Sequence, residues 1–204
     1  MMRNSRGPDR AFTLIEMIGV LAVIAILAAL LIPRIFESIN SARINEAVIS
    51  CQTIKTAVLE HYGKFYSLNS SNGVSFPIWD STFQNYDSIL LAEGLIDKPF
   101  SAAIAESSTI QLVNLSLTNS GPLTPITGAY DLDGDGNGDV AGGAQFVVEA
   151  FMANVSLSDA RALNNILDGP ALGEDTNGND FAGRVIYAKR GSNPLIVHIY
   201  ITHH

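Results

Sequence analysis

The chain has 204 residues and a formal net charge of −8 at pH 7, with 12 Lys and Arg against 20 Asp and Glu. This length suits one globular domain with an additional helix. The acidic excess argues against a basic nucleic-acid-binding surface, because such surfaces need clustered Lys and Arg. A single cysteine, Cys51, excludes a disulfide within the chain, and its apolar helical surroundings favour a small buried residue.

Residues 12–32 form an uninterrupted apolar run, FTLIEMIGVLAVIAILAALLI, in which Glu16 is the one charge. A helix of this length is about 30 Å long, which is the thickness of a bilayer's hydrocarbon core. The short segment before it carries Arg3, Arg6 and Arg10. The positive-inside bias therefore predicts a single transmembrane helix with its N-terminus in the cytoplasm and the residues after Ile32 outside.

Glu16 is unusual, because a carboxylate at mid-bilayer costs about 2.5–3.5 kcal/mol and less near the interface. It lies in the first turn of the predicted helix, where the positive end of the helix dipole offsets part of that cost. Two interpretations remain open at this point. Glu16 is either an interfacial acid that reaches water or an acid kept in an apolar setting for a cationic partner.

Residues 11–16, AFTLIE, follow a basic leader and precede the apolar run, and this arrangement resembles the N-terminus of type IV pilins and type II secretion pseudopilins. An ordinary signal peptide would have a small-residue cleavage site on the far side of a shorter run, where this chain has Pro33 and Arg34. The resemblance implies that a prepilin peptidase cuts between Ala11 and Phe12 and that Phe12 is then N-methylated. It also implies that Glu16 pairs with the Phe12 amine of a neighbouring subunit. The family usually has glycine where this chain has Ala11; alanine is also small, so cleavage is expected.

The resemblance divides the chain into a removed leader (1–11), a transmembrane and filament-core helix (12–33) and an extracytoplasmic pilin-like domain (34–204). It implies a single-pass protein of the bacterial inner membrane that later enters a periplasmic or extracellular filament. The implied partners are further copies of the chain, the prepilin peptidase, an inner-membrane platform protein and an assembly ATPase.

The helical pattern continues beyond Pro33, which removes one hydrogen bond and predicts a bend. Apolar residues then recur at spacings of three and four as far as Phe65, which indicates an amphipathic helix with one buried stripe. They include Ile35, Phe36, Ile39, Ala42, Ala47, Val48, Cys51, Ile54, Val58 and Tyr62.

The rest of the chain alternates polar connections with short apolar segments. Residues 67–82 are expected to be loop and residues 86–99 a short helix ended by Gly94. Strands are predicted over 109–118, 145–151, 184–189 and 195–201. A helix over 158–168 is expected to be capped by Ser158. The predicted class is therefore α+β, with a long N-terminal helix packed on an antiparallel sheet.

Residues 131–139, DLDGDGNGD, alternate oxygen-bearing side chains with glycines. They resemble the start of an EF-hand-type calcium loop. The expected ligands are Asp131, Asp133, Asp135, Asn137 and Asp139. The twelfth place holds Gly142 in place of the usual Glu, so a further ligand must come from elsewhere. The other interpretation is a solvated Asp/Gly turn without an ion.

A second acidic loop spans residues 174–180 and either completes the calcium site, forms another, or binds no ion. Its candidate ligands are Glu174, Asp175, Asn177, Asn179 and Asp180. Major pseudopilins commonly carry a structural calcium in a C-terminal loop, so the resemblance also implies calcium.

The sequence does not favour an enzyme. His61, His198, His203 and His204 do not show metal-ligand spacing, and no G-x-S-x-G motif is present. The expected function is a structural subunit of a type IV pilus-like filament or a type II secretion pseudopilus. The alternative is a membrane-anchored, calcium-binding domain that does not polymerise.

Overall fold

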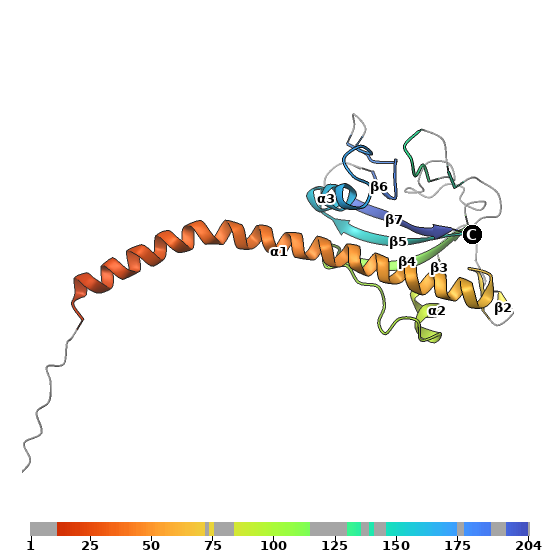
Figure 1. Ribbon diagram of the computed structural model, residues 1–204, viewed down its shortest axis with the longest axis horizontal. Coiled ribbons are helices and arrows are strands. Elements are labelled where there is room, and N and C mark those ends of the chain that lie inside the picture. The colour runs from red at the N-terminus through yellow and green to blue at the C-terminus, as the bar shows by residue number, and fades with distance from the viewer. Residues whose placement is uncertain are drawn as a thin grey trace, which may run out of the picture. The chain divides into compact units, whose positions relative to one another are not determined.

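The computed structural model describes residues 12–71, 74–75, 84–114, 130–135, 139–140, 146–174, 178–188 and 195–203. The chain divides into two units, Met1–Ala42 and Arg43–His204. The helix α1 (Leu14–Phe65) contributes to both units (Figure 1). Residues 1–11, which include Ala11 at the expected cleavage point, lie outside the described residues.

In the first unit, residues 14–32 of α1 consist almost entirely of Leu, Ile, Ala, Val and Met, several of which favour helix. Pro33 lies inside α1. The helix curves through this part of the chain and does not end there (Figure 1). Pro33 therefore does not interrupt the helix.

In the second unit, α1 buries one stripe of residues at spacings of three and four, as predicted for this part of the helix. Ile35, Phe36 and Ile39, which are expected in the same stripe, are exposed. The buried residues are Ile44, Ala47, Val48, Cys51, Ile54, Ala57, Val58 and His61. Cys51 is 4% exposed. Burial raises the pKa of its thiol to about 12, so this cysteine stays protonated and unreactive.

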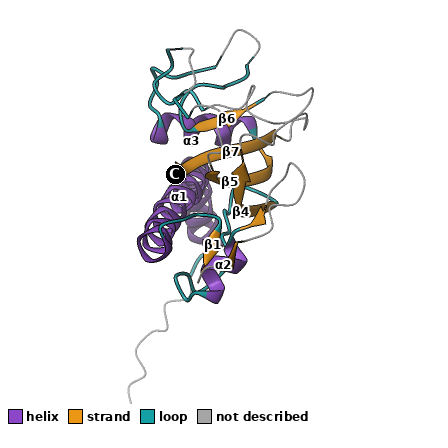
Figure 2. Ribbon diagram, turned by 90° about the vertical axis from the view of Figure 1, so that its right-hand side faces the viewer, coloured by secondary structure: helices purple, strands orange, loops and turns teal. Residues whose placement is uncertain are grey.

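The second unit contains a five-stranded antiparallel sheet in the order β3-β4-β5-β7-β6. The strands are β3 (Gln84–Asn85), β4 (Ser107–Asn114), β5 (Phe146–Val155), β6 (Val185–Tyr187) and β7 (Leu195–His203). The helices α2 (Asp87–Ala92) and α3 (Leu157–Leu167) lie beside β4 and beside β6 and β7 respectively (Figure 2). The predicted α+β class is confirmed.

The sheet buries side chains on both faces because residues alternate along each strand. On β7, Leu195, Val197, Ile199 and Ile201 join the main core with α1 and α3. A second, smaller cluster lies on the opposite face and contains Val113, Tyr130, Val140, Val147 and Ile186. Because Tyr130 and Val140 belong to that cluster, the segment that carries the first acidic loop covers the second face of the sheet.

Two sequence-based expectations need correction. The helix α3 is capped by Ser156, whose Oγ accepts a hydrogen bond from the Asp159 N–H at 3.1 Å, and not by Ser158. Ser156 has the extended backbone that a cap requires, whereas Ser158 lies inside the helix. The expected loop 67–82 also contains a small antiparallel pair, β1 (Ser70–Ser71) and β2 (Val74–Ser75).

A buried carboxylate joins α2 to the sheet. Asp87 is 3% exposed, and its Oδ1 accepts a hydrogen bond from the Phe100 N–H at 3.0 Å. Its Oδ2 accepts hydrogen bonds from the Thr109 hydroxyl and the Ile110 N–H, both at 2.9 Å. One side chain thus satisfies donors from β4 and from the segment after α2.

Candidate functional site

The start of α1 is closed by a reciprocal pair of side-chain caps. The Thr13 N–H and the Thr13 hydroxyl each donate to Glu16 Oε2 at 2.8 Å. The Glu16 N–H donates to Thr13 Oγ1 at 3.3 Å. This is a capping box, in which two residues three positions apart satisfy each other's unpaired backbone N–H groups. Sequence reasoning missed this role of Glu16, although the Thr-x-x-Glu spacing signals it.

The capping box uses one oxygen of the Glu16 carboxylate. Among the described residues, Glu16 Oε1 accepts no hydrogen bond. The carboxylate can therefore cap its own helix and still present an oxygen to a cation from outside the chain. Capping the helix and pairing with a cation are therefore compatible roles for Glu16.

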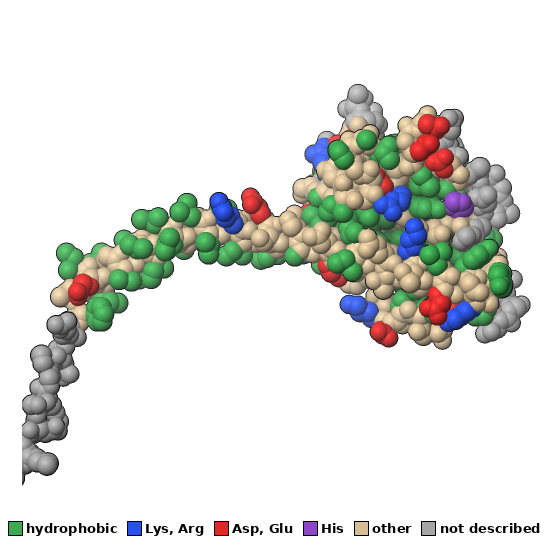
Figure 3. All heavy atoms as spheres, viewed as in Figure 1, with side chains coloured by type: hydrophobic (Ala, Val, Ile, Leu, Met, Phe, Trp, Pro, Cys, Tyr) green, Lys and Arg blue, Asp and Glu red, His purple; other side chains and the backbone are tan. Residues whose placement is uncertain are grey.

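The first half of α1 exposes large apolar side chains at most of its positions, and those on one face are visible in Figure 3. Phe12 is 79% exposed and Leu14 is 78% exposed. By length and composition, α1 is the one helix in the described part of the chain that could cross a membrane, and no residue of its most apolar stretch is buried. An apolar surface this large marks contact with a membrane or with other proteins.

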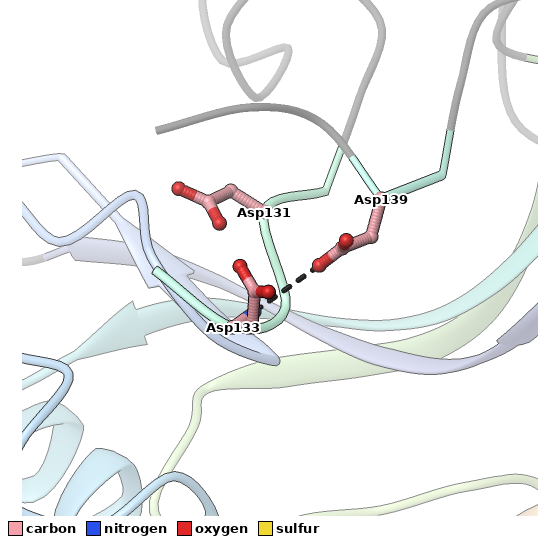
Figure 4. A group of neighbouring side chains, drawn as sticks. All are labelled: Asp131, Asp133 and Asp139. Atoms are coloured by element: carbon pink, nitrogen blue, oxygen red, sulfur yellow. Dashed lines mark hydrogen bonds between the residues drawn. The ribbon is translucent and has the colours of Figure 1, made fainter. Parts of the chain in front are cut away.

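The first acidic loop gathers three carboxylates. Ligand atoms of Asp131, Asp133 and Asp139 all lie within 4.8 Å of one another. Figure 4 shows the Asp139 side chain pointing across the loop toward Asp133. Asp139 Oδ2 accepts hydrogen bonds from the Leu132 N–H at 2.7 Å and the Asp133 N–H at 3.1 Å. Asp139 therefore closes the loop as well as adding negative charge.

The loop geometry depends on Gly134, which has a φ of +78°. A Cβ at this position would also collide with the Leu172 side chain. The Gly134 N–H donates to Asp131 Oδ1 at 2.7 Å, which tightens the turn. The loop thus turns back sharply against the segment that precedes the second acidic loop.

The chemistry of this group fits calcium. Calcium takes carboxylate oxygens at 2.3–2.6 Å, so ligand atoms of one ion lie within about 5 Å of each other. The three gathered carboxylates meet that condition. Asp135 lies outside this group, and its N–H donates to Asp133 Oδ1 at 3.1 Å. Asn137 lies outside the described residues.

The backbone of the first acidic loop contacts the segment that directly follows the second loop, but the carboxylates of the second loop have other partners. Asp131 forms a β-bridge with Ala182, and its carbonyl accepts the Gly183 N–H at 2.6 Å. Glu174 forms a two-pronged ion pair with Arg161, with both N–O distances 2.6 Å. Asp180 is fully buried and accepts a hydrogen bond from the Asn164 amide at 2.7 Å.

These contacts hold the second loop to α3, and the Tyr187 hydroxyl of β6 also donates to Glu174 Oε1 at 2.8 Å. Within the described residues, neither Glu174 nor Asp180 joins the group formed by Asp131, Asp133 and Asp139. Asn179 lies within the described residues. Asp175 and Asn177 lie outside the described residues.

Two histidines lie in the core, where each faces a carboxylate. His61 Nδ1 is 2.6 Å from Glu93 Oε2, and His198 Nδ1 is 2.9 Å from Glu149 Oε1. His61 is fully buried and His198 is 4% exposed. These imidazoles join secondary-structure elements. Sequence reasoning missed both pairs, because their partners are far away in the chain.

Comparison with known proteins agrees with the N-terminal motif. Residues 3–32 match the family model of the prokaryotic N-terminal methylation motif. The chain is 32% identical over 91 residues to a type IV major pilin protein PilE1 of Neisseria gonorrhoeae, covering 43% of this chain and 51% of that protein. It is 38% identical over 70 residues to a fimbrial protein of Neisseria meningitidis serogroup A, covering 33% of this chain and 41% of that protein.

The chain thus spans about half the length, or less, of the relatives it matches. No solved structure shows significant similarity to it. The methylation motif, the pilin relatives and the long helix packed on an antiparallel sheet agree with one another. On this combined evidence, the N-terminal part of the chain is similar to that of type IV pilins.

Proposed function

We propose that the chain is a structural subunit that polymerises into a type IV pilus-like filament. The observation that carries this proposal is the first half of α1, which is apolar on every side and begins with a capped acid. A bilayer covers such a surface in the stored subunit, and neighbouring copies of the same helix cover it in a filament. A helix that packed only within its own domain would show one buried stripe, as the second half of α1 does.

In this proposal a prepilin peptidase removes residues 1–11 and leaves Phe12 as the first residue, which is then N-methylated. The match to the methylation motif supports this processing. The Phe12 amine of one subunit pairs with Glu16 of the next and thereby neutralises both charges in an apolar environment. An assembly ATPase and an inner-membrane platform protein supply the work of extraction.

The names of the relatives are those of pilus proteins, which favours a pilus over a type II secretion pseudopilus. The acidic loop and the single buried cysteine favour the pseudopilus. The location of the filament separates these two forms, because a pilus extends from the cell surface and a pseudopilus remains in the periplasm.

Mechanical shearing of cells tests the filament proposal. We expect an immunoblot to detect the chain in sheared surface filaments, as well as in the inner-membrane fraction. Filaments found only in spheroplasts would indicate the pseudopilus form. If the chain is confined to the membrane fraction in cells that assemble other pilins, the non-polymerising anchored domain becomes the correct interpretation.

We also propose that the first acidic loop binds a structural calcium ion, with Asp131, Asp133 and Asp139 as its core ligands. Asp135 and Asn137 are the candidates to complete the coordination shell. The mutual approach of three carboxylates supports this, because they repel one another without a cation.

A thermal melt of the full chain in detergent micelles tests the ion. Calcium at about 100 times its Kd should raise the free energy of unfolding of the wild type by about 2.7 kcal/mol, compared with the same protein in the presence of a chelator. Asp133→Asn should lose most of this gain, whereas the exposed control Asp97→Asn should keep it. Equal melting temperatures for the wild type with calcium and with chelator would exclude the site.

A further inference from the structure

The acidic loop is anchored at its root by Tyr130, which immediately precedes Asp131. Tyr130 is 1% exposed and packs in the cluster on the second face of the sheet. Its carbonyl accepts the Asp139 N–H at 2.8 Å and the Val140 N–H at 3.3 Å. The backbone of Tyr130 therefore closes the loop, and its side chain fixes that closure to the sheet.

The hydroxyl of Tyr130 donates a hydrogen bond to Glu149 Oε2. Glu149 lies on β5 and is 2% exposed. Its other oxygen, Oε1, faces His198 Nδ1 on β7 at 2.9 Å. One buried carboxylate thus bridges the root of the acidic loop and the C-terminal strand.

A buried carboxylate is costly unless it is paired and hydrogen-bonded. Burial, and then the charge of Glu149, raise the pKa of the Tyr130 hydroxyl, so it stays protonated and donates. Burial lowers the pKa of His198, but the facing Glu149 carboxylate raises it by more, and the result lies above the ordinary value of 6.5. The three side chains therefore form one chain of hydrogen bonds with little net charge.

The other described groups on this face do not replace these contacts. Tyr200 and His203 of β7 bond to each other, and the Tyr200 ring lies 5.2 Å from the Tyr130 ring. From β6, Ile186 pairs with His198 and adds no charge. The Phe151 ring of β5 lies edge-on to His198 at 5.4 Å. Glu149 is thus the carboxylate on which both Tyr130 and His198 depend.

We propose that Glu149 is a positioning residue for the acidic loop: acting through Tyr130, and balanced by His198, it holds Asp131, Asp133 and Asp139 in their gathered arrangement. Cation affinity at the loop then depends on a group that never touches the cation. The affinity part of this inference rests on the proposed calcium site, whereas the order of the loop does not.

The test compares Tyr130→Phe and Glu149→Gln with the matched control Tyr200→Phe. The control removes a hydroxyl from the same cluster without touching Glu149. Hydrogen exchange is measured without calcium on the full chain in detergent micelles, at the Leu132, Asp133 and Asp139 amides. Calcium affinity is measured by titration calorimetry on the same samples.

We expect the amides of Tyr130→Phe to exchange about tenfold faster or more, because a hydrogen bond to a buried charge is lost. Calcium affinity should fall by a similar factor, and Tyr200→Phe should resemble the wild type in both measurements.

The pH dependence of exchange is a second readout. Wild-type amide protection, corrected for intrinsic exchange, should be highest below pH 6.5 and decline as pH rises through the elevated pKa of His198. In Glu149→Gln that decline should move to lower pH, because burial alone then acts on His198.

Each outcome has a distinct meaning. Wild-type protection and affinity in Tyr130→Phe would overturn the inference, as would an unchanged pH profile in Glu149→Gln. Absence of calcium binding by the wild type would remove the proposed ion, but the exchange comparison would still decide whether Glu149 positions the loop. If Glu149→Gln does not fold, Tyr130→Phe provides the decision alone.

Discussion

Glu16→Gln is expected to abolish incorporation of the chain into filaments while leaving it in the membrane. Glutamine serves in a capping box as well as glutamate does, so the start of α1 stays capped by Thr13. The substitution removes only the negative charge. Without it, the amine of a neighbouring Phe12 would be left unpaired among apolar helices, at a cost of several kcal/mol.

The matched control is Glu37→Gln, which neutralises an exposed acid on the same helix beyond the apolar run. It should assemble as the wild type does. The measurement is the ratio of chain in sheared filaments to chain in membranes, which should fall by more than tenfold for Glu16→Gln and stay constant for the control. Normal assembly of Glu16→Gln would mean that Glu16 serves only as a helix cap.

Asp87→Ala is expected to destabilise the second unit by about 3–4 kcal/mol. It leaves the Phe100 and Ile110 N–H groups buried without their acceptor, and each unsatisfied buried donor costs about 1–3 kcal/mol. Asp87→Asn should also be harmful, because its amide would place donors against donors. Thermal or urea unfolding of the full chain in detergent micelles, followed by circular dichroism, measures the loss.

Two comparisons separate the role of Asp87 from a general sensitivity of this region. Thr109→Val removes one of the three donors at nearly constant volume and should cost about 1 kcal/mol. Asp97→Ala removes an exposed acid beyond the same short helix and should change stability by less than about 0.5 kcal/mol. A loss for Asp87→Ala no greater than that for Thr109→Val would show that the carboxylate does not join α2 to the sheet.

The sequence predicted the features that depend on local pattern. The apolar run, the amphipathic second half of α1 and the strands near 109–118 and 195–201 all follow from periodicity, and the structure confirms them. The sequence predicts the cap of α3 at Ser158, two residues late, because Ser156 and Ser158 both lie near the start of the helix and only backbone geometry separates them.

Contacts between distant residues could not be predicted in the same way. Asp87 with Ile110 and Glu149 with His198 join residues that are adjacent only after the sheet forms. The second acidic loop looked like a ligand source because its composition is acidic, but partners far along the chain decide what its carboxylates do. Arg161 and Asn164 on α3 engage Glu174 and Asp180. Composition therefore indicated where oxygen atoms are dense, and the fold determined which of them converge.

The mass of the N-terminal peptide from chain recovered in sheared filaments tests the central claim most directly. A filament subunit processed as proposed begins with N-methylated Phe12, so tandem mass spectrometry should find that residue followed by Thr13 and Leu14. A peptide that begins with Met1, in chain recovered from intact filaments, would contradict processing and with it the pairing of Glu16 with a new amine.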